Sequence, residues 1–267
     1  MDDVVLKIGG FNILVKFNKV EFIQKVKMPD YIRWRYKDFI AILRKSLEID
    51  YVITFKYVNY TRSLTSPKGE HMFINLYDQT SSKSLTTFYH ISLFQFDVIL
   101  THVLQKMLAR NEGFIVHTSA ISVSNKAQCF MGKSGAGKST IVKLLSTRYK
   151  PLADDSGIIR MENDQYFFYQ MPLIDKNEKI QKSSHPVPLG GIHFLKKGQD
   201  SEVRIIKDTE EIIKKLSLQL YSDQGDIRKQ LSYMAKFINS QCSFSTLTFS
   251  MDHKKLLEVL EVYETKV

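Results

Sequence analysis

Residues 132–140 read Gly132-Lys133-Ser134-Gly135-Ala136-Gly137-Lys138-Ser139-Thr140, and this segment is the strongest indication of the fold. It fits the phosphate-loop pattern G-x-x-x-x-G-K-[ST], and it lies between the apolar run 127–131 and the run 141–145, whose apolar residues have helical spacing. This order predicts a strand, a phosphate loop and a helix. Glycines let backbone N–H groups converge on phosphate oxygens, Lys138 can reach the β and γ phosphates, and the Ser139 hydroxyl can ligate Mg²⁺. We therefore predict that residues 132–140 bind a nucleotide, and the full match argues against the alternative of a glycine-rich turn without a ligand.

Length and composition predict a soluble globular protein. The 267 residues are 43% hydrophobic, which is enough for one large core or two modest ones. The chain opens with the acidic Met1-Asp2-Asp3 rather than with a signal peptide, and no apolar run approaches the roughly 18 residues of a spanning helix. Cys129 and Cys242 show neither metal-ligand spacing nor a disulfide framework. We therefore expect a cytoplasmic protein without a membrane partner.

The charge of the chain is basic, with 38 Lys+Arg against 28 Asp+Glu and a net charge of +10. The basic residues are scattered over 25–45 and 176–215 and form no single stripe, so we expect no nucleic-acid partner. Two interpretations stay open. The lysines form a solvated surface, or they attract an acidic protein or peptide substrate.

The first part of the chain, 1–92, is predicted to form a small α+β subdomain. Gly9-Gly10 between two short apolar runs predicts a β-hairpin over 4–16, and apolar spacing predicts a helix from about Asp30 to Leu47, with Trp34 among its apolar positions. Further strands are predicted at 51–58, 72–77 and 85–91. Their aromatic residues are expected in the core rather than on a base-stacking platform.

The second part, 93–267, is predicted to be an α/β domain that begins with a helix over 94–110. A strand over 113–123 and the strand, loop and helix described above follow it. Later elements are predicted as follows: strands at 203–206 and 244–249, and helices over 209–220, capped by Asp208, over 226–238, and after Asp252.

Two acidic residues, Asp154 and Asp155, follow the run 149–153 after the loop helix. A carboxylate at a strand end beside a phosphate loop is placed to hold the metal or to orient the attacking hydroxyl. The sequence Asp-Asp-Ser-Gly is equally good turn chemistry, so spacing alone leaves both interpretations open and does not say which aspartate is the base. In the same way His117, taken alone, is typical of a hydrogen-bonded strand histidine.

Three separated elements together resemble the C-terminal catalytic domain of HPr kinase/phosphorylase, a domain related in fold to phosphoenolpyruvate carboxykinase. They are His117, the loop Gly132–Ser139 and Ala153-Asp154-Asp155. The resemblance is clearest over 113–157 and continues through 188–195. The segment 8–13 is also similar to the opening of shorter HPr kinase homologues, including those found in peptide-modification clusters. The resemblance implies an α/β P-loop kinase core in residues 93–267.

The resemblance also implies roles for individual residues. Lys138 would stabilise the transferring phosphoryl group, Ser139 would ligate Mg²⁺, Asp155 would accept the proton of a serine hydroxyl, and His117 would lie beside the nucleotide phosphates. Two adjacent carboxylates can divide the two jobs, so we expect Asp154 to join Ser139 at the metal. The Glu-Ile-Arg-Gly stretch of the full enzymes is absent here, and His185 lies roughly where its glutamate would fall.

We therefore expect an ATP- and Mg²⁺-dependent kinase that phosphorylates a serine hydroxyl on a peptide, a protein or free serine. The alternative is a nucleotide-binding switch or slow ATPase that acts through a partner, which the absent stretch favours. A GTPase is disfavoured because the chain has no Asn-Lys-x-Asp motif. The identity of the acceptor, the second metal ligand, phosphorylase activity and homo-oligomerisation stay open.

Overall fold

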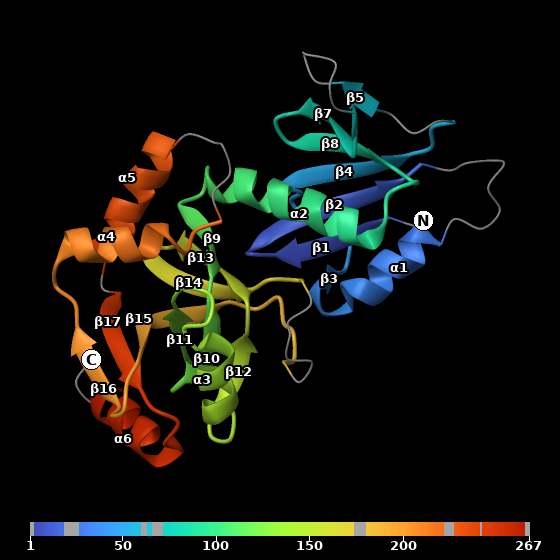
Figure 1. Cartoon of the computed structure of the whole chain (residues 1–267). Helices are drawn as coiled ribbons and strands as arrows, with labels where there is room; N and C mark the ends of the chain where they lie inside the picture. Colours follow the sequence, from blue (N-terminus) through green and yellow to red (C-terminus); the bar gives the residue numbers. More distant parts are fainter. Residues whose placement is uncertain are drawn as a thin grey trace. The chain divides into compact units, whose positions relative to one another are not determined.

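The computed structural model of the chain describes residues 3–18, 27–59, 63–65, 72–173, 180–221, 227–240 and 242–264. These residues contain six helices and two large mixed sheets, which confirms the predicted α/β class (Figure 1). The chain divides into two compact units, Met1–Leu104 and Gln105–Val267. The division falls inside a helix, whereas the sequence placed the domain boundary near residue 92, just before that helix.

The first unit is built on a six-stranded mixed sheet. Its elements are β1 (Val4–Ile8), β2 (Phe11–Phe17), α1 (Met28–Arg35), the 3-10 turn η1 (Lys37–Phe39), β3 (Ile40–Ala41), β4 (Tyr51–Lys56), β5 (Ser63–Thr65), β6 (Met72–Ile74), β7 (Tyr77–Ser81), β8 (Ser84–Phe88) and α2 (Leu93–Leu108). The sheet order is β3-β1-β2-β4-β8-β7, and β5 and β6 form a separate ribbon. Gly9 and Gly10 join β1 to β2 with φ angles of 58° and 79°, which confirms the hairpin, because glycine adopts this left-handed backbone without strain.

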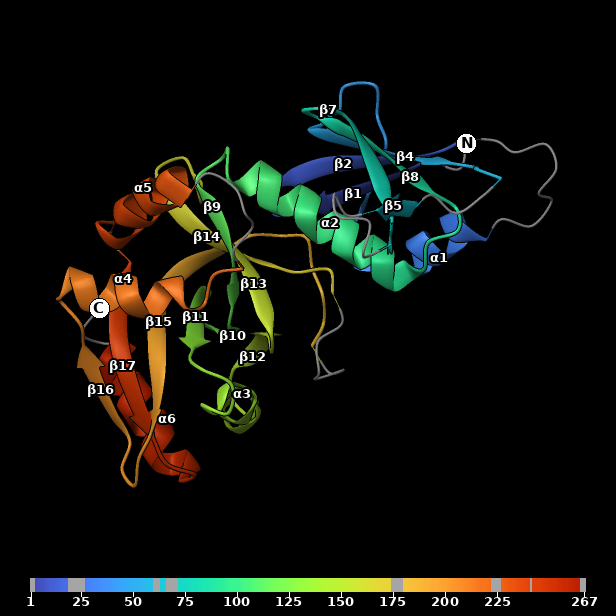
Figure 2. The same ribbon diagram turned by 45° about the horizontal axis from the view of Figure 1, so that its top comes forward.

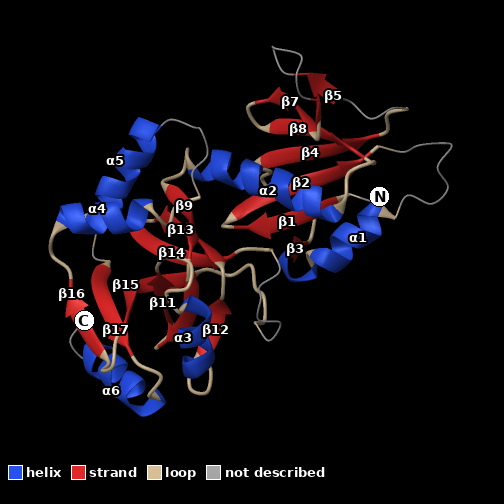
Figure 3. Cartoon of the chain, viewed as in Figure 1, coloured by secondary structure: helices blue, strands red, loops and turns tan. Residues whose placement is uncertain are grey.

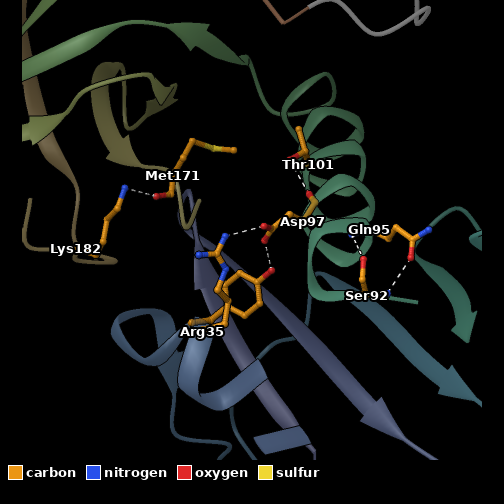
Figure 4. A network of polar contacts seen from close by, with 8 residues as sticks. Arg35, Ser92, Gln95, Asp97, Thr101, Met171 and Lys182 are labelled. Carbon is orange, nitrogen blue, oxygen red and sulfur yellow. Dashed lines mark hydrogen bonds and ion pairs between the residues drawn. The ribbon is translucent and has the colours of Figure 1, made fainter. Parts of the chain in front are cut away.

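Helix α2 covers one face of this sheet (Figure 3). The ring of Phe96 lies 5.5 Å from that of Phe55 on β4 and 5.8 Å from that of Tyr36, and all three side chains are buried. The helix begins with a capping box, since the Ser92 and Gln95 side chains each accept the other residue's backbone N–H (Figure 4). The predicted helix over 94–110 is thereby confirmed within two residues at each end.

An ion pair joins α1 to α2. Arg35 donates to the Asp97 carboxylate at 2.7 Å, and their side chains are only 11% and 13% exposed (Figure 4). The Tyr36 hydroxyl donates to the second oxygen of the same carboxylate. A charge pair so shielded from water holds the two helices in one arrangement, because either charge alone would be left without a partner.

The helix predicted from Asp30 to Leu47 is wrong beyond Arg35. Residues Ile40 and Ala41 instead pair with β1 as a short edge strand. An apolar residue at every third or fourth position suits a short helix followed by a 3-10 turn and a strand as well as it suits one long helix. Trp34 is 69% exposed, so it does not belong to the core. The run predicted as one strand over 72–77 is also divided, between β6 and β7.

The second unit is built on a nine-stranded sheet. Its strands are β9 (Gly113–His117), β10 (Ser119–Val123), β11 (Lys126–Met131), β12 (Lys150–Ala153), β13 (Ser156–Glu162), β14 (Gln165–Gln170), β15 (Val187–Lys197), β16 (Glu202–Ile205) and β17 (Ser243–Phe249). Its helices after α2 are α3 (Lys138–Leu145), α4 (Thr209–Ser217), α5 (Ile227–Ile238) and α6 (His253–Glu264). The order is β12-β10-β11-β15-β14-β13-β9, and β17 pairs with β15 and β16.

Helices cover both faces of this sheet (Figure 2). One core contains Ile212 and Leu216 of α4 with Phe237 of α5, packed with Cys129 of β11. The other core contains residues of α3 and α6 packed with Phe130, the next residue of β11. Successive strand side chains point to opposite faces, so β11 contributes to both cores. The strand that carries the glycine loop is therefore fixed from both sides.

Several predicted boundaries in this unit change. The strand predicted over 113–123 is two strands, β9 and β10, that separate at Thr118, and α4 ends at Ser217 rather than Leu220. Asp226, the predicted first residue of a helix, lies outside the described residues, and α5 begins at Ile227. None of the helices in the described part of the chain has the length and hydrophobicity needed to cross a membrane.

Candidate functional site

The glycine loop connects the end of β11 to the start of α3. Gly135 and Gly137 have φ angles of 77° and 101°, so both need the freedom of glycine. A Cβ atom on Gly137 would lie 2.6 Å from Cζ of Phe249, whereas one on Gly135 would meet no atom within 4 Å. Lys138 Nζ donates to the carbonyl oxygens of Gly132 and Lys133 at 2.7 and 3.4 Å. The lysine amino group is therefore held across the loop.

Four strands end at the same edge of the sheet as the loop. Strands β11, β15 and β17 are parallel neighbours, and β12 runs in the same direction because β10 is antiparallel to both β11 and β12. Ligands of open α/β sheets bind at the carboxyl ends of such strands. This edge carries Lys197 and Gly198 after β15, Phe249 to Met251 after β17, and Asp154 after β12.

The two aspartates form the turn between β12 and β13. Asp154 is only 4% exposed, and the Ser119 hydroxyl donates to its carbonyl oxygen at 2.9 Å and to its carboxylate at 3.5 Å. The Thr118 N–H donates to the Asp155 carbonyl at 3.2 Å. The turn is thus fixed to the point where β9 and β10 separate. The two interpretations of this pair are compatible, because a turn at a strand end also carries both carboxylates to the loop.

His117 is the last residue of β9. Its N–H donates to the Gln219 carbonyl at 2.7 Å, and its ring stacks on that of Tyr221 with centroids 4.0 Å apart. Burial, reinforced by the negative charge of Asp155, raises the pKa of Tyr221 to about 12, although a hydrogen bond from Ser156 opposes the shift. Tyr221 therefore lies close to both His117 and Asp155, and it stays protonated at neutral pH.

One cavity of about 820 Å³ brings these residues together. Among the predicted site residues, its lining contains His117, Gly132, Lys133, Ser134, Gly135, Gly137, Lys138, Ser139, Thr140, Asp154 and Asp155. Ala136 is not in this lining and borders a neighbouring cavity instead. His185 is exposed in the loop before β15, where its ring hydrogen-bonds to the Ser183 hydroxyl at 3.1 Å, and it does not line the cavity. The roles assigned to these residues stay predictions.

Sequence reasoning missed a second set of residues around the cavity. The additional lining residues are Lys197, Gly198, Leu218, Gln219, Phe249, Ser250 and Met251, and Tyr221 stacks behind His117. No local motif marks them. Only the rule that parallel strands end at one edge could have pointed to residues 197–198 and 249–251, and that rule needs the strand order, which the sequence does not supply.

The oxygen donors around the loop fit a hard cation. Mg²⁺ takes oxygen ligands and usually binds through one or two carboxylates together with substrate phosphates and water. The Ser139 hydroxyl and the carboxylates of Asp154 and Asp155 line the same cavity. In the described parts of the chain, no group of three or more His, Cys, Asp or Glu side chains could hold a metal ion. Ser139 and the two carboxylates are oxygen donors of the kind that hold Mg²⁺ together with substrate phosphates.

Comparison with known proteins places the chain in a family. The model of the SynChlorMet cassette protein ScmC family matches residues 86–221, just over half of the chain, and the chain belongs to that family. No curated protein matches the sequence. Among solved structures, the Hpr(Ser) kinase/phosphatase from Coxiella burnetii is similar, with a TM-score of 0.35 and 11% identity, over 57% of this chain and 97% of that one.

Proposed function

We propose that the protein is an ATP- and Mg²⁺-dependent kinase that transfers the γ-phosphoryl group of ATP to a serine hydroxyl. The observation that carries the proposal is the shared cavity. Three separate parts of the chain meet there: the start of α3 with Lys138 and Ser139, the turn after β12 with Asp154 and Asp155, and the end of β9 with His117. A lysine, a hydroxyl and two carboxylates beside a glycine loop are the parts that phosphoryl transfer requires. By this proposal the second unit is a P-loop kinase core of the HPr kinase type.

Each residue has one task in this proposal. The loop and Lys138 would bind the phosphates, Ser139 and Asp154 would hold Mg²⁺, and His117 would lie beside the phosphates. A metal held there would supply positive charge that offsets the charge of the phosphoryl oxygens. Asp155 orients the acceptor: the serine Oγ forms a bond to the γ-phosphorus, the bond to the leaving ADP oxygen breaks, and the serine proton passes to the Asp155 carboxylate.

Label transfer tests the proposal directly. The full chain is incubated with γ-labelled ATP, Mg²⁺ and fractions of a lysate of the source cell, and label is followed into peptides, proteins and phosphoserine. Asp155→Asn should keep nucleotide binding and lose transfer by about 10²–10⁴-fold, because the proton acceptor is gone. Asp164→Asn is the matched control, since Asp164 is exposed in the turn between β13 and β14. Near-normal transfer by Asp155→Asn would remove Asp155 from the mechanism.

A nucleotide-dependent switch is the second candidate. The observation that favours it is that Asp154 and Asp155 are the only carboxylates among the described residues lining the large cavity. A slow ATPase acting through a partner needs no further metal ligand. In the same experiment this candidate predicts tight ATP binding with label released only as inorganic phosphate.

A further inference from the structure

A second cavity adjoins the outer side of the glycine loop. Its volume is about 410 Å³, within the range of about 300–1,000 Å³ of small-ligand sites. Residues 132–136 of the loop form one wall, Phe194, Leu195 and Lys197 of β15 form another, and Lys215, Leu218 and Gln219 at the end of α4 complete it. Phe194, Leu195 and Lys215 line this cavity but not the large one, and they take no part in nucleotide binding as proposed above.

Among the described residues that line this second cavity, all the charged ones are lysines. Lys133, Lys197 and Lys215 come from three different elements, and the lining contains no acidic residue. Lys215 is held in place, since its Nζ lies 5.5 Å from the centre of the Phe194 ring and donates to the Thr246 hydroxyl at 3.3 Å. Glu211 pairs with Lys215 at 3.1 Å, but it also pairs with Arg204 at 3.5 Å, so it offsets only part of the local charge.

The second cavity shares seven lining residues with the large one. Gly132 to Gly135, Lys197, Leu218 and Gln219 line both. Leu218 is 63% exposed although it is apolar, and it borders both cavities. A chain that presents a hydroxyl to Asp155 can therefore continue over Leu218 into the second cavity. An exposed apolar side chain beside clustered lysines suits a peptide with both apolar and acidic residues.

We propose that the second cavity is an acceptor subsite, which binds a carboxylate side chain of an acidic peptide while the serine of that peptide lies at Asp155. This inference rests on the proposed kinase function and adds the class of the acceptor. Lys133, Lys197 and Lys215 attract the carboxylate, and Leu218 contacts the peptide between the two positions. Attraction of this kind is screened by salt, because the lysine side chains are partly exposed.

Two peptides of equal length test the subsite on the full chain. One has a serine flanked by glutamates, and the other has glutamines in their place. Each is labelled with fluorescein, and binding is measured by fluorescence anisotropy at low and at physiological salt. We expect the glutamate peptide to bind about tenfold more tightly at low salt, which corresponds to about 1.4 kcal/mol, and the preference to shrink as salt rises.

Variants of α4 show where that preference arises. Lys215→Gln should reduce it about threefold and Lys215→Glu should abolish it, as expected for loss and reversal of one partly exposed charge. Lys214→Gln is the matched control, since Lys214 is exposed on the same helix and lines neither cavity. Binding of Mg·ATP should stay unchanged in all three variants, because neither Lys214 nor Lys215 lines the large cavity.

The other outcomes overturn the subsite or the kinase separately. Equal binding of the two peptides, or a preference that survives Lys215→Glu, refutes the subsite. Pyrophosphate binding that depends on Lys215, without a glutamate preference, would assign the cavity to a free polyanion instead. Lys215-dependent peptide preference without label transfer to any serine peptide would refute the kinase and leave a peptide-binding site.

Discussion

Replacing Gly137 with alanine tests whether the loop conformation depends on packing against Phe249. Gly137 has a φ angle of 101°, and a side chain in such a conformation costs about 1–3 kcal/mol. The new Cβ would also lie 2.6 Å from Phe249 Cζ. Since this ring is buried in the core between α3, α6 and β17, overpacking adds about 1–3 kcal/mol. We therefore expect Gly137→Ala to lower the free energy of unfolding by about 2–6 kcal/mol.

Gly135→Ala is the matched control, because Gly135 has a φ angle of 77° but would meet no atom within 4 Å. Its loss of stability should come from backbone strain alone, so the free energies of unfolding of the two variants should differ by about 1–3 kcal/mol. Urea unfolding of the full chain measures this difference. Phe249→Leu should recover part of it in the Gly137→Ala background, because leucine lacks the ring atoms that clash.

Nucleotide binding completes the test. If the loop shifts and the fold persists, the loss appears in Mg·ATP affinity, where each 1.4 kcal/mol corresponds to about a tenfold change in Kd. A titration of both alanine variants with Mg·ATP detects that shift. Equal stability and equal affinity of the two variants would show that the contact with Phe249 does not constrain the loop.

Three further predictions concern residues outside the glycine loop. Burial lowers the pKa of His193 from 6.5 to about 4. Between these two pH values the unfolded chain binds a proton at His193 and the folded chain does not. The free energy of unfolding should therefore fall by up to about 3 kcal/mol as the pH drops from 6.5 to 4. In urea unfolding across that pH range, the free energy of unfolding should decline less steeply for His193→Gln than for the wild type. An equally steep decline in the variant would show that His193 does not cause it. Asp97→Asn leaves Arg35 without a charge partner in a nearly buried position, and urea unfolding should report a loss of about 3 kcal/mol in the first unit; a loss no larger than that of a surface pair would contradict this. Tyr221→Leu removes the ring stacked on His117 and should lower kcat about fivefold at unchanged KM for ATP, whereas Tyr221→Phe keeps the ring and the rate; equal rates for the two variants would show that the stack does not position His117.

The elements predicted correctly from the sequence carry local signals. Gly9-Gly10 forms the predicted turn, and the apolar spacing of α2 places that helix within two residues at each end. Asp208 caps α4 by accepting the Glu210 N–H at 3.0 Å. In each case the deciding interaction lies within a few residues of the chain, so a short window contains the information.

The elements predicted wrongly depend on distant partners. Residues 113–123 form an unbroken β-rich run in the sequence, yet β9 pairs with β13 while β10 pairs with β11 and β12. Two sets of partners require the strand to divide at Thr118, and the run itself does not show this. Ile40 and Ala41 likewise form an edge strand because they pair with β1, which is distant in the sequence and not visible in the local pattern.

The chemical groups available to this protein can be read from its amino-acid sequence: a glycine loop with Lys138 and Ser139, a pair of aspartates, and a histidine on a strand. Residue type and local spacing are enough for that, because phosphate and metal contacts depend on particular functional groups. The folded structure was needed to show that His117 stacks on Tyr221, that Phe249 packs on Gly137, and that a second, lysine-lined cavity lies beside the first. These contacts join residues far apart in the chain, and their positions follow from strand order and register, which are set by the energy of the whole packed sheet rather than by any segment of it.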